Sequence, residues 1–109
     1  MGLLKKIFGQ KKMIDSRLIG IWISDLADEL TVSNPGSVRL TFSDSGDLIY
    51  DVMDGEKIQR INMIFWTEGN IVISDQPSHP KKERTKFEFE SDRKLILEFG
   101  GERTVFLRQ

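Results

Sequence analysis

Hydrophobic and polar residues alternate along most of this chain, as they do in β-strands that bury one face. Residues 38–42 are a clear case, because Val38, Leu40 and Phe42 share one face and two polar residues share the other. Turn-forming residues interrupt the alternation every 8–12 residues or so, roughly the spacing of sandwiches and barrels. The pattern predicts eight strands, within residues 18–24, 38–42, 48–53, 56–67, 71–74, 85–90, 95–99 and 105–108.

The connections between these strands are short, and Asp54-Gly55 is the strongest hairpin signal among them. Consecutive hairpins without long crossovers favour an up-and-down barrel, which also removes the exposed edges of a sheet. We therefore expect a mainly β fold, an eight-stranded antiparallel up-and-down barrel, over residues 17–109. A barrel of this size is either filled by side chains or holds one small ligand.

The longest predicted strand has apolar residues on both of its faces. Ile61, Met63 and Phe65 fall on one face, whereas Ile64 and Trp66 fall on the other with an isoleucine earlier in the run. A β-bulge or a bend would allow both sets to face the core. We expect such an irregularity in this strand.

Residues 1–16 carry the one clear helical pattern and form a separate N-terminal leader. Leu4, Ile7 and Phe8 share a face at i, i+3 and i+4 spacing, and residues 1–12 contain lysines but no acid. We predict a short basic amphipathic helix whose apolar face caps the open end of the barrel. A protein partner is an alternative, and contact of residues 1–12 with a membrane surface is a less favoured one.

A second short helix or turn is expected within residues 25–33. Asp25 is a candidate N-cap, and two acidic residues follow in the first turn. The Asn34-Pro35-Gly36 break ends this segment before the second strand.

Two sites at opposite ends of the chain carry a family resemblance. Gly20-Ile21-Trp22 in the first strand and Arg108 in the last strand resemble the signature of the lipocalin-like (calycin) small β-barrels, and the hairpin around residues 40–48 resembles their short bacterial members. The resemblance spans about residues 17–108 and implies that Trp22 lies at the closed end of a barrel. It also implies that Arg108 packs over the indole, a cation–π contact.

Composition and charge exclude several kinds of protein. The chain has 109 residues and a net charge of −1. It contains no cysteine, so disulfides, thiol nucleophiles and iron–sulfur ligation are excluded. There is no stripe of interleaved basic and aromatic residues, so we expect no nucleic-acid partner. Lysines interrupt the apolar residues of the leader, which therefore does not resemble a secretory signal, and we expect a cytoplasmic protein.

No group of residues has the pattern of a catalytic or metal centre. His79 is the only histidine, and it lies in a Pro-rich loop beside Ser78, where adjacency alone makes no nucleophile–base pair. No run of acids has the spacing of a calcium loop, and without a second histidine or a cysteine a transition-metal site is not expected. We expect a protein that is not an enzyme and that needs no cofactor.

The candidate binding residues are those whose alternation places them inside the barrel. Tyr50 shares a face with two apolar neighbours, and its buried hydroxyl would need a partner. Arg60 lies in the strand with two apolar faces, and inside a barrel it would demand a carboxylate or a ligand. With Phe42 and Phe87 these residues make up the expected interior site, unless the polar ones lie at the surface or the rim.

Two functions follow from this interpretation. The first is non-enzymatic binding of a small apolar or amphipathic ligand inside the barrel. The alternative is a filled barrel that serves as a scaffold for protein interaction, as an inhibitor or immunity-type protein does. A cavity is expected in the first case, and a solid core with an exposed apolar patch in the second.

Overall fold

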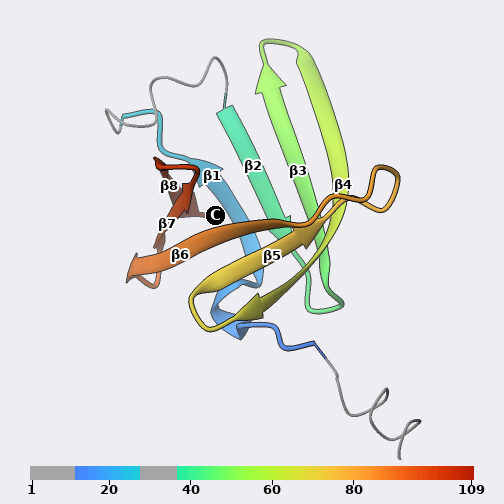
Figure 1. Ribbon diagram of the computed structural model, residues 1–109. Helices are drawn as coiled ribbons and strands as arrows, with labels where there is room; N and C mark the ends of the chain where they lie inside the picture. Colours follow the sequence, from blue (N-terminus) through green and yellow to red (C-terminus); the bar gives the residue numbers. More distant parts are fainter. Residues whose placement is uncertain (1–11, 28–36) are drawn as a thin grey trace, which may run out of the picture.

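The computed structural model describes residues 12–27 and 37–109. Within them, eight antiparallel strands follow one another around a single closed barrel, which confirms the predicted fold (Figure 1). The strands are β1 (Gly20–Ser24), β2 (Ser37–Phe42), β3 (Asp47–Asp54), β4 (Lys57–Glu68), β5 (Ile71–Asp75), β6 (Glu83–Ser91), β7 (Lys94–Phe99) and β8 (Glu102–Arg108).

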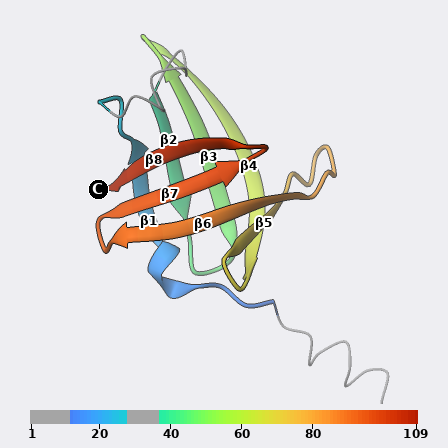
Figure 2. The ribbon, with the colours of Figure 1, turned by 60° about the vertical axis from the view of Figure 1, so that its left-hand side comes forward.

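The barrel is flattened into two walls. In Figure 2, β6, β7 and β8 run across the direction of β2, β3 and β4, which lie behind them. The alternating apolar residues of both walls form one core. Within the wall that contains β2 and β4, Phe42 packs edge-on against Phe65 with ring centroids 4.9 Å apart. The most completely buried apolar side chains are Leu18, Trp22, Leu95 and Val105.

The first and last strands close the barrel by pairing with each other. Trp22 of β1 lies opposite Arg108 of β8, and Ile23 lies opposite Leu107. The indole of Trp22 is fully buried, and its N–H donates a hydrogen bond to the Leu18 carbonyl at 2.9 Å. Residues from the two ends of the sequence thus build one end of the barrel.

The guanidinium of Arg108 seals this end. It lies over the Trp22 ring, 4.1 Å from the centroid. Its N–H groups donate to three backbone carbonyls, those of Arg17, Ile19 and Asp92, at 2.6–2.9 Å. The contact implied by the family resemblance is present, and the hydrogen bonds hold the guanidinium in place.

Most of the predicted N-terminal helix falls outside the described residues, and the part that is described is not α-helical. Residues 1–11 lie outside them, residues 12–15 have no regular secondary structure, and only a short 3-10 helix (Ser16–Leu18) follows. The backbone N–H of Thr67 donates to the Met13 carbonyl at 2.8 Å, so Met13 is bonded to β4 and not to a helix of its own. Asp15 caps the 3-10 helix with its carboxylate. None of the described helices has the length and apolar character to cross a membrane.

The second expected helix is described only at its beginning. Leu26 and Ala27 form a turn, in which the Ala27 N–H donates to the Asp25 carboxylate at 3.0 Å. The rest of that segment, residues 28–33, and the break at residues 34–36 lie outside the described residues.

The longest strand, β4, pairs with β3 or β5 at every residue without a shift of register, so it has no bulge, which was one of the two irregularities expected there. Ile61, Met63 and Phe65 face the interior, while Trp66 faces outward. Trp66 is buried nevertheless, because Lys12 lies over its ring at 3.8 Å and Lys82 lies over it at 5.6 Å. Of the second apolar face, Trp66 is therefore covered by lysines and not by the core, whereas Ile58 and Ile64 are exposed. An irregularity of register lies instead in β6, near Phe89.

Candidate functional site: a cavity in the barrel

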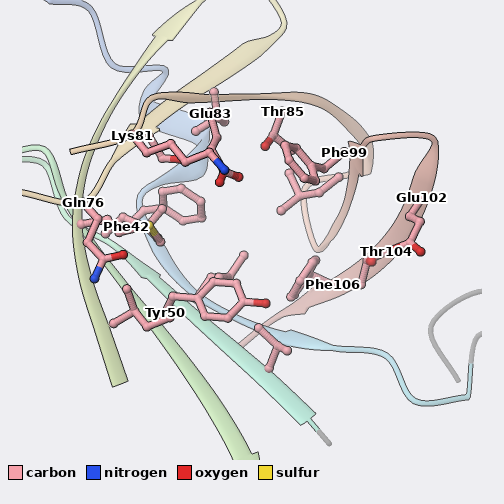
Figure 3. Close-up of a pocket in the computed structure, with 18 of the residues that line it drawn as sticks. Phe42, Tyr50, Gln76, Lys81, Glu83, Thr85, Phe99, Glu102, Thr104 and Phe106 are labelled. Atoms are coloured by element: carbon pink, nitrogen blue, oxygen red, sulfur yellow. The ribbon is translucent and has the colours of Figure 1, made fainter. Parts of the chain in front are cut away.

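The barrel encloses a cavity of about 530 Å³ between its two walls. Exposed residues such as Lys81 and Glu102 belong to its lining, so the cavity opens to solvent (Figure 3). Glu102 begins β8, and Trp22 lies opposite Arg108 at the other end of that strand, so the opening lies away from Trp22. This volume lies within the range of about 300–1,000 Å³ in which small-molecule pockets fall.

Apolar side chains form the deeper wall of the cavity. They come from six of the eight strands, because each of these strands turns alternate residues inward. Leu40 and Phe42 of β2 face Phe106 of β8. Ile61 and Met63 of β4, which are only partly buried, continue this apolar wall toward the mouth. Such a wall favours hydrocarbon or aromatic groups, because their burial removes apolar surface from water.

Polar side chains gather at the mouth. Gln76 and Lys81 lie on one side of the opening in Figure 3, and Glu102 and Thr104 lie on the other. The mouth therefore offers hydrogen-bond donors, acceptors and charges of both signs to the part of a ligand that stays near water. The further polar lining residues are Ser74, His79, Glu83 and Thr85.

Tyr50 places a hydroxyl inside the apolar part of the cavity. Its ring lies along the wall and its oxygen points into the open space (Figure 3). Burial raises the pKa of this phenol, so it remains a neutral donor and acceptor over the physiological range. No hydrogen bond joins this hydroxyl to any residue that the structure describes, which leaves it available to a ligand.

The structure brings together two of the four residues that were expected in the barrel interior. Phe42 and Tyr50 both line the cavity. Phe87 is buried in the core and does not line it, and its ring packs edge-on against Phe89 at 5.8 Å. Arg60 lies on the outer face of β4, where it pairs with Asp51, so its position differs from the interior one that we expected.

Arg60 belongs to an ionic cluster on the outer face with Arg39 and Asp51. The Asp51 side chain is 1% exposed and lies between the two arginines, which are opposite it on β2 and β4. Its oxygens accept from Arg60 Nε at 2.8 Å and from Arg39 Nη2 at 3.0 Å. Hydrogen bonds from Arg60, together with those from Arg39, lower the pKa of Asp51 despite the opposing effect of burial.

The register of the β3–β4 hairpin brings this cluster together. The two turn residues are Gly55 and Glu56, one position later than the predicted Asp54-Gly55, and this sets Asp54 opposite Lys57 and Asp51 opposite Arg60. Alternation alone shows that Asp51 faces away from the core, and it does not show that two arginines cover it.

The remaining candidates give no catalytic arrangement. His79 is exposed at the mouth, and its Nδ1 lies 3.1 Å from the Ser78 hydroxyl, so this pair sits in solvent as a loop interaction. Among the residues with described positions, no three His, Asp or Glu side chains are grouped so that they could hold a metal ion.

No protein-family model, curated protein or solved structure matches the chain. The functional conclusion therefore rests on the geometry of the barrel and its cavity.

Proposed function

We propose that this protein binds a small amphipathic molecule in the barrel and does so without catalysing a reaction, as a lipocalin-like binding protein of the cytoplasm. The observation that carries the proposal is the cavity of about 530 Å³, with an apolar inner wall and a polar mouth. An apolar body would occupy the space around Phe42 and Phe106, and a polar group would lie against Tyr50 or the rim.

The closed end supports this proposal. Trp22 and Arg108 seal the barrel at one end, so a ligand has one way in and one way out. A water-excluding floor together with an open, polar mouth holds an amphipathic molecule in one orientation.

The alternative of a filled scaffold has less support, because a filled barrel would not leave this volume between Leu40, Leu97 and Phe106. An interaction module with a hollow interior is distinguished by experiment, because it predicts that blocking the cavity has no effect on function.

Titration with an apolar fluorescent probe, N-phenyl-1-naphthylamine, tests the proposal. We expect saturable binding, and we expect Thr104→Phe to weaken it at least tenfold, because Thr104 lines the cavity and a phenyl ring would fill part of it. Thr41→Phe is the matched control: Thr41 alternates with the inward-facing Leu40 and Phe42, so the same ring would lie on the outer face.

Equal affinity of the two threonine variants for the probe would contradict binding in the cavity. Circular dichroism and urea unfolding of each variant show whether the barrel is intact. Absence of saturable binding to the unmodified protein would contradict the proposal directly.

A further inference from the structure

One strand of the barrel has an edge that no described strand covers. β4 pairs with β3 through residues 57–64, but it pairs with β5 only through residues 64–68. The edge of β4 from Lys57 to Met63 that faces away from β3 is therefore unpaired within the described part of the chain. It runs alongside the mouth of the cavity, to which this same stretch contributes Ile61 and Met63.

Proline explains why β5 leaves this edge. The last pair of the two strands joins Ile64 to Asp75, so a longer β5 would set Pro77 opposite Asn62. Proline has no N–H to give to the ladder at that position. The chain turns away there, and the Lys81 N–H donates to the Asp75 carboxylate at 2.8 Å, which holds the outgoing loop.

The register identifies the backbone groups that face the open edge. The two-residue hairpin makes Asp54 and Lys57 a hydrogen-bonded pair, so every second residue of β4 from Lys57 onward bonds to β3. The N–H and C=O groups of Ile58, Arg60 and Asn62 accordingly point away from β3. They offer a strand-length row of donors and acceptors.

The side chains along this edge indicate what kind of strand would fit. A residue opposite Ile61 would point into the mouth of an apolar cavity, whereas a residue opposite Arg60 would face outward beside an arginine side chain that is 52% exposed. Lys57 adds a second cation, and Ile58 is 59% exposed. These surroundings favour an extended segment that alternates apolar and acidic residues.

We propose that the edge of β4 at Ile58, Arg60 and Asn62 binds an extended peptide by strand addition, with one apolar side chain of the peptide entering the cavity mouth beside Ile61. The peptide takes the place that β5 would occupy if it continued. Main-chain hydrogen bonds give the affinity, and the cavity and Arg60 select the side chains. This inference rests on the proposed function, because the anchoring side chain uses the same cavity.

The test measures fluorescence anisotropy of a labelled peptide, Thr-Leu-Glu-Leu-Val-Glu, blocked at its C-terminus, against a scrambled peptide of the same composition. In antiparallel pairing its first leucine lies opposite Ile61 and its first glutamate opposite Arg60. We expect the patterned peptide to bind more tightly than the scrambled one. In hydrogen exchange, we expect added peptide to slow exchange of the amides of Ile58, Arg60 and Asn62.

Asn62→Pro tests the edge separately from the cavity. Asn62 is exposed and its N–H faces the open edge, so proline removes a donor without breaking the pairing with β3. We expect this variant to lose about tenfold or more in peptide affinity. The substitution removes the hydrogen bond from the N–H of residue 62, and the proline ring obstructs the neighbouring hydrogen bond to the peptide. It should keep its affinity for N-phenyl-1-naphthylamine, which shows that the barrel is folded. Asn62→Ala, which keeps the N–H, should bind the peptide normally.

Other results would overturn the inference in distinguishable ways. If Asn62→Pro binds the peptide as well as the unmodified protein does, or if the peptide fails to bind where the naphthylamine probe binds, strand addition is wrong and the proposed cavity function stands. If neither the peptide nor the probe binds, both proposals fail. If the protein self-associates and Asn62→Pro abolishes that association, the edge serves a second copy of this chain and not a peptide.

Discussion

Gly20 lies directly beneath Arg108, so closely that a Cβ atom on Gly20 would stand 2.9 Å from Nη1 of the guanidinium. The backbone of Gly20 also has φ +134°, a conformation that L-residues rarely adopt. The glycine is therefore required twice, once for its own backbone and once for the arginine that covers Trp22.

Gly20→Ala should destabilise the protein by about 1–3 kcal/mol, the cost of a strained backbone and a displaced guanidinium. A double-mutant cycle with Arg108→Ala, measured by urea unfolding, separates these two costs. Gly20→Ala should cost less when Arg108 is absent, because only the backbone strain remains. Equal cost in both backgrounds would show that the close approach to Arg108 does not matter.

The Asp51 carboxylate should make the stability of the barrel depend on pH. The pKa of Asp51 is lowered in the folded protein by Arg60 and then Arg39, so its stabilising contribution is complete above the unfolded-state pKa of about 3.8. That contribution is lost as the pH falls through the lower, folded-state pKa.

Asp51→Asn should therefore lower the free energy of unfolding near neutral pH by about 1–2 kcal/mol, a modest value because water screens the half-exposed arginines. Unfolding measured from pH 6 to pH 2 should show this difference shrinking below about pH 3.8. Asp54→Asn, at the exposed last residue of the same strand, is the control and should show no comparable difference. A difference that stays constant down to pH 2 would contradict the stabilising role of the ionised carboxylate.

Tyr50 should select ligands by hydrogen bonding. Tyr50→Phe should weaken binding of 2-naphthol by about 2–10-fold, the effect of one hydrogen bond, and leave binding of 2-methylnaphthalene unchanged. Isothermal titration calorimetry of both ligands measures this. Equal losses for the two compounds would indicate altered packing and not a lost hydrogen bond.

Burial of Tyr50 also predicts that the stability of the folded protein falls at alkaline pH. Since the pKa of the phenol is raised in the folded protein, the unfolded chain ionises first, and stability falls as the pH rises above about 10. Unfolding measured between pH 9 and pH 11 should show part of that fall disappearing in Tyr50→Phe. An unchanged profile would mean that Tyr50 has no share in it.

Substitutions of Phe87 and Phe42 should affect stability and ligand affinity differently. Phe87 is 5% exposed and does not line the cavity, so Phe87→Leu should cost about 1–2 kcal/mol of unfolding free energy without changing the affinity for N-phenyl-1-naphthylamine. Phe42→Leu should change both quantities, because Phe42 belongs to the core and to the cavity wall. A clear loss of probe affinity in Phe87→Leu would contradict this division.

Alternation and turn chemistry were sufficient to predict the eight strands, because a strand with one buried face must repeat every two residues. The pairing of Trp22 with Arg108 was also within reach, since a closed meander sets its first strand beside its last. The covering of Trp66 could not be predicted from the sequence, because it depends on Lys12 and Lys82, which approach from segments without a repeating pattern.

The candidate site was only partly predictable. Alternation placed Phe42 and Tyr50 inside the barrel, and both line the cavity. Arg60 was assigned to the interior because its strand is apolar on both faces, and only the register of the hairpin shows that it faces Asp51 on the outside. The cavity itself depends on how far the two walls stand apart, which no local pattern encodes.

The most direct test of binding inside the barrel is a two-dimensional amide NMR titration of the full chain with N-phenyl-1-naphthylamine. Binding in the cavity predicts that the largest shifts fall on residues of its wall, such as Leu40, Tyr50 and Thr104, and that the outward-facing Ile21 and Leu107 change little. Shifts centred on that outer face, or no saturable shifts at all, would contradict the proposal that the barrel interior is the binding site.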